Sequence, residues 1–322
     1  MNKARTIYFY RKFNRFTGGH LKVWDYFNHT KLAGNYLPYI YLESGGDVSE
    51  INPWLSSTQN QLPEWSPLEA DVLFLAGMDW FTLPYPERRN WPKPIINLIQ
   101  GFRHSVPDTL LFECLSNHAI RICVSQEVAN SILATGRVNG PVFTIPNGID
   151  YSQISDLYQP DCKKDIDILI VGLKNPKIAE ELEALCLNLP IKAVCLLEQI
   201  PRPEFLKTMA NSLITVFLPG VLEGFYLPAL EGMSVGTFVI CPDCIGNLSY
   251  CQNMHNCRMP EYSAQNIFEA VSNTLNMSTL SRNQILQNAN QTVKKHFIEY
   301  EQLAFTSILK KLDSLWKQEP NV

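Results

Sequence analysis

Two glutamates separated by seven residues, Glu223 and Glu231, form the pattern that points most clearly to chemistry. They follow an apolar run at 213–218 and flank a turn in which Pro228 suits the start of a helix and Gly236 its end. A helix start exposes free backbone N–H groups, which suit a diphosphate. Carboxylates on either side would accept hydrogen bonds from sugar hydroxyls. The spacing alone fits two solvated surface acids better than a binding site.

Composition limits the classes of protein to which this pattern can belong. The 322 residues are 46% hydrophobic and 18% charged, which indicates a packed protein of two domains. A net charge of −4 provides no general attraction to nucleic acid. We expect a cytoplasmic protein, because no secretory signal or membrane-spanning run is evident and the nine cysteines are typical of reduced core thiols.

Short apolar runs alternate with helical patterns, which predicts α/β domains with parallel sheets. In the first half we expect strands at 6–10, 37–42, 71–75, 94–99, 120–124 and 142–145, and helices at 21–32 and 126–133. In the second half we expect strands at 167–171, 192–196, 213–218, 237–241 and 256–259, and helices at 178–186, 204–211, 229–235 and 265–275. Gly34 and Gly136 fall where helix C-caps belong.

The turn-forming run at 146–150 and the polar stretch after it interrupt this alternation, which then restarts. We therefore expect two domains, 1–155 and 156–322. A cleft at the carboxyl ends of both sheets would bind the ligands. The segment 283–317 predicts a long amphipathic helix with no strand after it. We expect the last part, about 298–322, to pack back on the N-terminal domain.

The region around the two glutamates resembles the donor site of retaining GT-B glycosyltransferases of family 4. Gly-Phe-x-Leu-Pro follows Glu223, and the helix and strand at 201–218 resemble those that lead into the family's Glu-x7-Glu motif. The segments 122–125 and 145–150 resemble the close of the family's N-terminal domain. Pro-Gly ends the strand here, where the family has Pro-Ser. The resemblance implies a GT-B fold, with two Rossmann-like doubly wound domains for acceptor and donor.

The resemblance also implies roles for individual residues of the donor site. Glu223 would contact the donor hexose and Glu231 the ribose hydroxyls. The nucleotide base would lie near the loop containing Ile200 and Arg202, and the loop 243–247 would line the site. The amides that would meet the diphosphate belong to Gly224, Phe225, Tyr226 and Leu227.

A second part of the implied phosphate site departs from the family pattern. Relatives commonly carry Gly-Arg where the second domain's first strand ends, whereas Gly172 is followed here by Leu173. Lys174 or Lys177 would then hold the diphosphate, since lysine binds phosphate as a point charge. A solvated basic loop is the alternative.

Two further loops of the first domain belong to the implied site. Gly18 and Gly19 precede a helix and would approach the donor phosphate and the acceptor; a simple turn is the alternative. His104 would contact the donor sugar, with Arg103 as a reserve phosphate or acceptor contact. A structural histidine explains His104 equally well.

Other patterns favour this chemistry less. A zinc site or a redox pair is a weak alternative for the cysteines near 241–257, because the spacing is tight and Cys241 ends an apolar strand. Asp165 and Asp167 lead directly into a strand, so they do not predict a metal motif. The last pattern is a set of aromatic and cationic residues that could meet an acceptor or lipid phosphate, namely Tyr8, Tyr10, Arg11, Lys12, Phe13, Arg15 and Phe16.

The resemblance implies a metal-independent, retaining hexosyltransferase of polysaccharide or glycoconjugate biosynthesis, with no cofactor. UDP-glucose or a close relative would be the donor, and a glycan or lipid-linked molecule the acceptor. Peripheral membrane contact through the N-terminal domain is an open alternative. The competing functions are a nucleotide-sugar epimerase, a phosphorylase, which needs a longer chain, and a non-catalytic nucleotide-sugar-binding subunit, suggested by Leu173.

Overall fold

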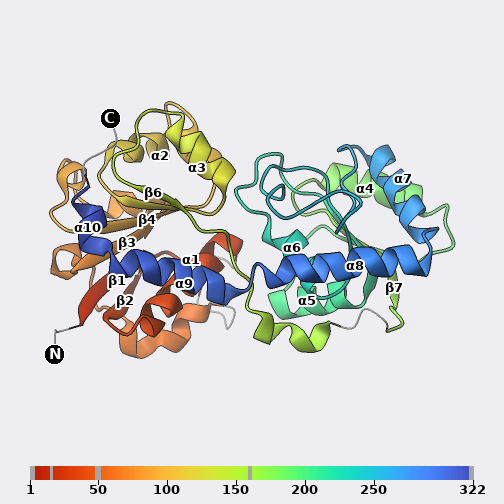
Figure 1. Cartoon of the computed structure of the whole chain (residues 1–322), viewed down its shortest axis with the longest axis horizontal. Coiled ribbons are helices and arrows are strands. Elements are labelled where there is room, and N and C mark those ends of the chain that lie inside the picture. The colour runs from red at the N-terminus through yellow and green to blue at the C-terminus, as the bar shows by residue number, and fades with distance from the viewer. Residues whose placement is uncertain (1–3, 15–16, 48–51, 159–161, 319–322) are drawn as a thin grey trace. The chain divides into compact units, whose positions relative to one another are not determined.

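The computed structural model describes residues 4–14, 17–47, 52–158 and 162–318 (Figure 1). The chain forms two compact units, one of residues 1–147 with 301–322 and the other of residues 148–300. Arg15 and Phe16 of the predicted aromatic and cationic set lie outside the described residues. Among the residues that are described, no helix is long and apolar enough to cross a membrane.

The first unit contains a parallel sheet of six strands in the order β2-β1-β3-β4-β5-β6. The strands are β1 Arg5–Arg11, β2 Tyr36–Leu42, β3 Val72–Ala76, β4 Ile95–Ile99, β5 Ile120–Cys123 and β6 Val142–Thr144. The helices are α1 Gly18–Leu32, α2 Leu110–Glu113, α3 Gln126–Leu133, α9 Ile298–Lys310, which starts in the second unit, and α10 Leu312–Trp316. Every residue of β3 and β4 is buried, as expected for central strands covered on both faces.

The second unit contains a parallel sheet of four strands in the order β10-β9-β7-β8. The strands are β7 Ile166–Val171, β8 Ala193–Leu196, β9 Ser212–Phe217 and β10 Phe238–Ile240. The helices are α4 Pro176–Cys186, α5 Arg202–Ala210, α6 Leu227–Ser234, α7 Ala264–Leu275 and α8 Thr279–Lys294. The core lies between the sheet and α4 and α7, where apolar residues such as Ile168, Leu182 and Ile267 are fully buried.

Ten of the eleven predicted strands are confirmed within a residue or two, and the eleventh, 256–259, is wrong. There the chain turns: Met254 has a φ of 62°, and its amide donates to the carbonyl of Cys257 at 2.8 Å. Only Arg258 pairs with a strand, as an isolated bridge to Ile240. Gly34 and Gly136 follow helix ends with φ of 73° and 65°, a region that glycine adopts without strain.

The predicted long C-terminal helix is three helices, α8, α9 and α10. The break after α8 has a physical cause, because the chain forms a bridge there instead of continuing the helix. The amide of Ile149 donates to the carbonyl of His296 at 2.8 Å, and the amide of Ile298 donates to the carbonyl of Ile149 at 3.0 Å. Gly148 is required beside this bridge, since an added Cβ would lie 2.6 Å from the Cα of Ile298.

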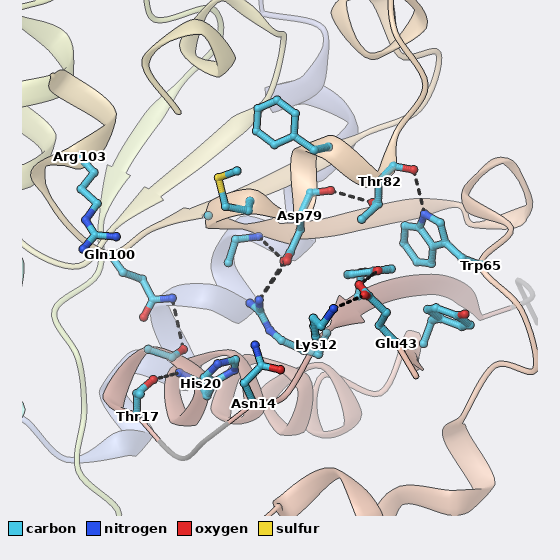
Figure 2. A pocket seen from close by; sticks show the side chains of 18 residues that line it. Lys12, Asn14, Thr17, His20, Glu43, Trp65, Asp79, Thr82, Gln100 and Arg103 are labelled. Carbon is cyan, nitrogen blue, oxygen red and sulfur yellow. Dashed lines mark hydrogen bonds and ion pairs between the residues drawn. The ribbon is translucent and has the colours of Figure 1, made fainter. Parts of the chain in front are cut away.

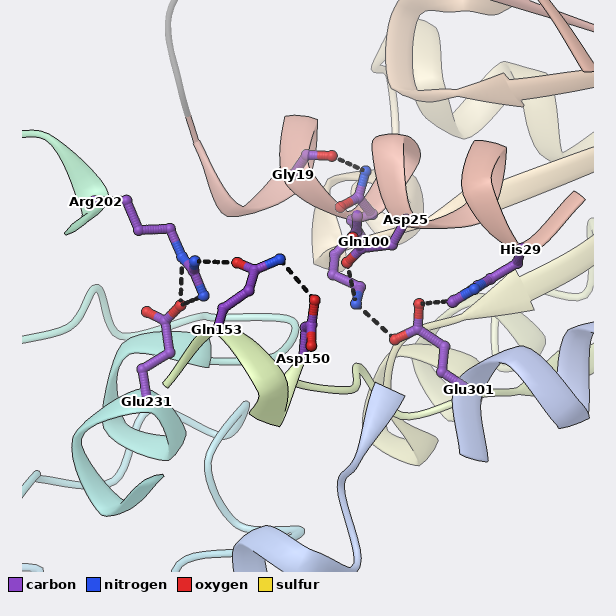
Figure 3. A network of polar contacts seen from close by, with 10 residues as sticks. Gly19, Asp25, His29, Gln100, Asp150, Gln153, Arg202, Glu231 and Glu301 are labelled. Carbon is purple, nitrogen blue, oxygen red and sulfur yellow. Dashed lines mark hydrogen bonds and ion pairs between the residues drawn. The ribbon is translucent and has the colours of Figure 1, made fainter. Parts of the chain in front are cut away.

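Within the first unit, buried charges join α9 to α1 (Figure 3). The Nζ of Lys22 lies 2.6 Å from Glu301 and 2.7 Å from Asp25, and the Nε2 of His29 lies 3.1 Å from Glu301. Burial opposes ionisation of Glu301, but Lys22 and His29 hold its pKa below the ordinary value. A carboxylate near the C-terminus of the chain therefore fixes the helix that follows β1.

We expect Glu301→Ala to destabilise the first unit by about 3–5 kcal/mol, because it leaves the buried Lys22 cation short of a partner. Denaturant unfolding followed by circular dichroism measures the loss. Glu299→Ala is the matched control, since Glu299 is an exposed acid on the same helix. Equal stability of the two variants would contradict this role for Glu301.

Candidate functional site

The carboxyl ends of β7, β9 and β10 bring the predicted donor residues of the second unit together. Gly172 and Lys174 follow β7, and Glu223 follows β9. After β10 the chain returns to Glu223, whose amide donates to the carbonyl of Cys244 at 3.0 Å. The main chain of Glu223 also forms a bridge with Ile245. Parallel strands that end at one sheet edge therefore position these residues.

The carboxylate of Glu223 is mostly buried and holds two donors. Its Oε1 accepts from the amide of Gly220 at 2.9 Å and from the Nζ of Lys174 at 2.5 Å. Glu223 is 17% exposed and Lys174 is 51% exposed. The Nζ of Lys174 also lies 5.6 Å from the centre of the Tyr226 ring. Lys174 is therefore beside the predicted hexose contact, whereas Lys177 is an exposed residue in the first turn of α4.

In the turn before α6, some backbone amides have a hydrogen-bond acceptor in the described part of the chain and others do not. Those of Tyr226 and Leu227 donate to the carbonyls of Gly246 and Phe225, each at 3.1 Å. No described residue accepts a hydrogen bond from the amides of Gly224 or Phe225. The side chains of Phe225 and Tyr226 are buried, so only their main chain can meet a diphosphate.

Glu231 lies one turn inside α6, is 7% exposed and is paired with Arg202 (Figure 3). The Nε and a terminal nitrogen of Arg202 lie 2.9 and 2.8 Å from Oε1 of Glu231. The other terminal nitrogen of Arg202 donates to Gln153 at 3.1 Å, and Gln153 donates to Asp150 at 2.6 Å. A chain of polar contacts thus orients the predicted ribose carboxylate. Sequence reasoning missed Gln153, because only folding brings it to Arg202. Ile200, just before α5, is half-buried.

Glycines allow close packing at this sheet edge. An added Cβ at Gly172 would lie 2.3 Å from the Cβ of Ala179 on α4, and one at Gly246 would lie 2.3 Å from the carbonyl oxygen of Glu223. The loop carrying Gly246 is fixed by Asn247, a fully buried residue whose side chain donates to the carbonyl of Pro242 at 2.9 Å. The predicted hexose contact therefore depends on a glycine in the loop after β10.

The cysteines near this loop are buried free thiols. Burial raises the pKa of the Cys241 thiol, and the hydrogen bond with Cys257 and burial raise that of Cys251. In the part of the chain that the structure describes, no group of three His, Cys, Asp or Glu side chains could hold a metal ion.

Of the predicted site residues in the first unit, Gly19 and Arg103 line a pocket and His104 does not. Gly18 and Gly19 open α1, and the carbonyl of Gly19 accepts from Gln100 at 3.2 Å. His104 is 4% exposed, and burial lowers its pKa to about 4, so its ring is neutral at pH 7. Gly19 and Arg103 line a pocket of about 1010 Å³, of which His104 is not a lining residue (Figure 2).

Polar and aromatic side chains at the carboxyl ends of β1, β2, β3 and β4 line the pocket. Tyr10, Arg11 and Lys12 of the predicted aromatic and cationic set line it, whereas Tyr8 and Phe13 are buried in the core. The other residues that line it are Asn14, Thr17, Gly19, His20, Tyr41, Glu43, Trp65, Ala76, Gly77, Met78, Asp79, Phe81, Thr82, Gln100 and Arg103.

Comparison with known proteins agrees with this architecture. Residues 153–292 match the family model described as Glycosyl transferases group 1. No curated protein matches the chain. Solved structures match over nearly the full length at low identity. Sucrose-phosphate synthase from Thermosynechococcus elongatus is 12% identical with a TM-score of 0.70, and 96% of this chain and 99% of that chain are covered. HepE from Anabaena, in complex with UDP and glucose, is 13% identical with a TM-score of 0.72, and 96% and 100% are covered.

A third structure, a glycosyltransferase from Rickettsia africae, is 13% identical with a TM-score of 0.71, and 97% of this chain and 99% of that chain are covered. The protein has the two-domain, Rossmann-like GT-B fold. The family match and the neighbours together support a glycosyltransferase.

We expect Gly246→Ala to displace the main chain of Glu223, because the new methyl group would meet its carbonyl oxygen. The loss of stability should be about 1–3 kcal/mol, typical of overpacking. Thermal unfolding checks it, with Gly101→Ala as the control, since an added Cβ there meets nothing within 4 Å. A Gly246→Ala protein as stable as the control would show that the loop adapts freely.

Proposed function

We propose that this protein is a retaining hexosyltransferase that binds UDP-glucose or a similar UDP-hexose in the second unit and the acceptor in the first. The observation that carries this proposal is the position of two carboxylates, Glu223 and Glu231, on either side of the open amides of Gly224 and Phe225. In this arrangement Glu223 accepts hydrogen bonds from the hexose hydroxyls, the amides bind the diphosphate and Glu231 accepts hydrogen bonds from the ribose hydroxyls.

The ion pair of Lys174 with Glu223 suggests how the donor enters. Lys174 is half-exposed on a flexible side chain, so it can turn from the carboxylate to a phosphate. Glu223 would keep its contact with the amide of Gly220 and gain the hexose hydroxyls. Lys174 would then pair with a phosphate, and Glu223 would exchange its cation for hydrogen bonds from the hexose hydroxyls.

The proposed reaction is a front-side displacement. The bond from the anomeric carbon to the diphosphate oxygen breaks, and the acceptor oxygen attacks from the same face. The leaving diphosphate takes the acceptor's proton, so no protein base is needed. Lys174 and the open amides would stabilise the charge that develops on the diphosphate, and this is the main contribution of the protein to the rate. No metal ion or cofactor takes part in this proposal.

The comparisons support the donor class by analogy. The Anabaena HepE structures hold UDP-glucose, or UDP with glucose, and the trehalose-6-phosphate protein from E. coli holds UDP-2-fluoro glucose. A glycan or lipid-linked acceptor, used in polysaccharide or glycoconjugate biosynthesis, completes the proposal.

One observation favours a second function, a non-catalytic nucleotide-sugar-binding subunit. Leu173 is 40% exposed at the position where relatives of the family-4 type carry a phosphate-binding arginine. Lys174 can replace the missing arginine only if its ammonium group contacts the phosphate.

Activity tests the main proposal directly. Glu223→Ala is expected to lower kcat/KM for UDP release from UDP-glucose by about 10- to 100-fold, the value of a hydrogen bond to a charged group. Glu231→Ala should act mainly by weakening UDP binding. Glu181→Ala, an exposed acid on α4, is the matched control and should stay within about twofold. Full turnover by Glu223→Ala would remove Glu223 from the site.

The same assay separates the finer parts of the proposal. EDTA should leave the rate unchanged, and proton NMR should find the anomeric configuration of the donor in the product. Inversion would contradict the retaining mechanism, and loss of activity in EDTA would contradict metal independence. Tight UDP-glucose binding with no UDP release in the presence of glycans would favour the non-catalytic subunit.

A pair of lysine variants identifies the phosphate contact. We expect Lys174→Met to weaken UDP binding by at least about tenfold, because a charge-assisted hydrogen bond is lost. Lys177→Met, three residues further on in the first turn of α4, should change the Kd by less than about twofold. Isothermal titration calorimetry measures both. The reverse order would assign the contact to Lys177.

A further inference from the structure

The pocket of the first unit has an aromatic end (Figure 2). The ring of Tyr10 lies 5.6 Å from that of Tyr41 and 5.2 Å from that of Trp65. The Tyr10 hydroxyl donates to Glu43, and the indole N–H of Trp65 donates to the carbonyl of Thr82 at 3.3 Å. Tyr41 packs on both of these rings, and its centroid lies 6.2 Å from that of Trp65. The faces of such rings suit the apolar face of a sugar ring.

The opposite end of the pocket carries positive charge. Figure 2 shows Arg103 and Gln100 far from Trp65 and Glu43. Arg103 is exposed and has no ion-pair partner among the residues that the structure describes. The start of α1 lies at this end, where Thr17 and Gly19 line the pocket and the first turn contains no acid. The partial positive charge of the helix start therefore adds to that of Arg103.

A buried ion pair forms another part of the lining. Arg11 is 7% exposed, and one of its terminal nitrogens donates to Asp79 at 3.1 Å. The Nε and the other terminal nitrogen are buried with no hydrogen-bond partner among the described residues. Asp79 also accepts from the amide of Ala76 at 2.8 Å. Since a guanidinium is always charged, Asp79 is committed to Arg11.

Positively charged side chains outnumber carboxylates among the described residues that line the pocket. Three cationic side chains, Arg11, Lys12 and Arg103, face two carboxylates, Glu43 and Asp79. Lys12 is 2.6 Å from Glu43, so both carboxylates are already paired. Arg103 and the start of α1 are the positive charge that remains for a ligand.

We propose that this pocket binds an anionic saccharide, with a sugar ring on the wall of Tyr41 and Trp65 and a carboxylate or phosphate towards Arg103. The volume of about 1010 Å³ is at the upper end for small-molecule sites, so it accommodates more than one sugar unit. That this ligand is the acceptor rests on the proposed function. Its binding does not, because every residue of the pocket belongs to the first unit.

Matched saccharides test the inference on the full-length protein by titration calorimetry without donor. Digalacturonate is compared with the neutral galactobiose, and glucose 6-phosphate with glucose. We expect each anionic sugar to bind at least about tenfold more tightly than its neutral partner, as for a charge-assisted hydrogen bond. The two pairs distinguish a carboxylate from a phosphate. Inorganic phosphate alone should bind more weakly than glucose 6-phosphate, because it lacks the ring.

Variants locate the binding. Arg103→Gln should remove the preference for the anionic sugars, and Trp65→Leu should weaken all sugars. Arg89→Gln, which changes an arginine outside the pocket, should change neither. Equal binding of charged and neutral sugars, no binding of either anionic sugar, or an Arg103→Gln protein like the control would overturn the inference. Each of these results could occur with normal UDP-glucose turnover, so the proposed function is judged separately.

Discussion

The second unit depends on how Glu223 is held. Its main chain pairs with the loop after β10, and its carboxylate accepts from the turn after β9 and from Lys174 after β7. One residue therefore connects the segments that follow three strands. These contacts on both the main chain and the side chain hold the Glu223 carboxylate in place just before α6.

The second carboxylate is held by a different device. Glu231 is nearly buried, and the cost of burying its charge is offset by Arg202, which Gln153 and Asp150 orient in turn. Both Arg202 contacts fall on the same carboxylate oxygen, Oε1. The other oxygen can then face a ribose without breaking the ion pair. Arg202 thus acts as a positioning residue in the site that we propose.

In the first unit, buried ion pairs also hold the elements that line the pocket. Burial of Lys22 with Glu301 and Asp25 fixes α1, whose N-terminus lines the pocket. Burial of Asp79 raises its pKa to about 6 although Arg11 opposes the shift, so the pair is poorly solvated. In both places a desolvated charge is matched by a neighbour, and only the charges at the pocket surface are open to a ligand.

The sequence by itself determined the strands and most of the helices, because short, largely apolar runs such as 72–75 and 95–99 that alternate with helical patterns are typical of buried parallel strands. The sequence also placed Glu223 and Glu231 in a strand–turn–helix pattern, which can be recognised because its residues are close together in the chain. The roles of the two glutamates as hexose and ribose contacts remain a prediction. Tertiary structure alone decided which cation meets each acid, where the C-terminal helix breaks and that His104 is buried beside an exposed Arg103. These features join residues far apart in the chain, and contacts between distant residues leave no periodic or spaced pattern in a single sequence.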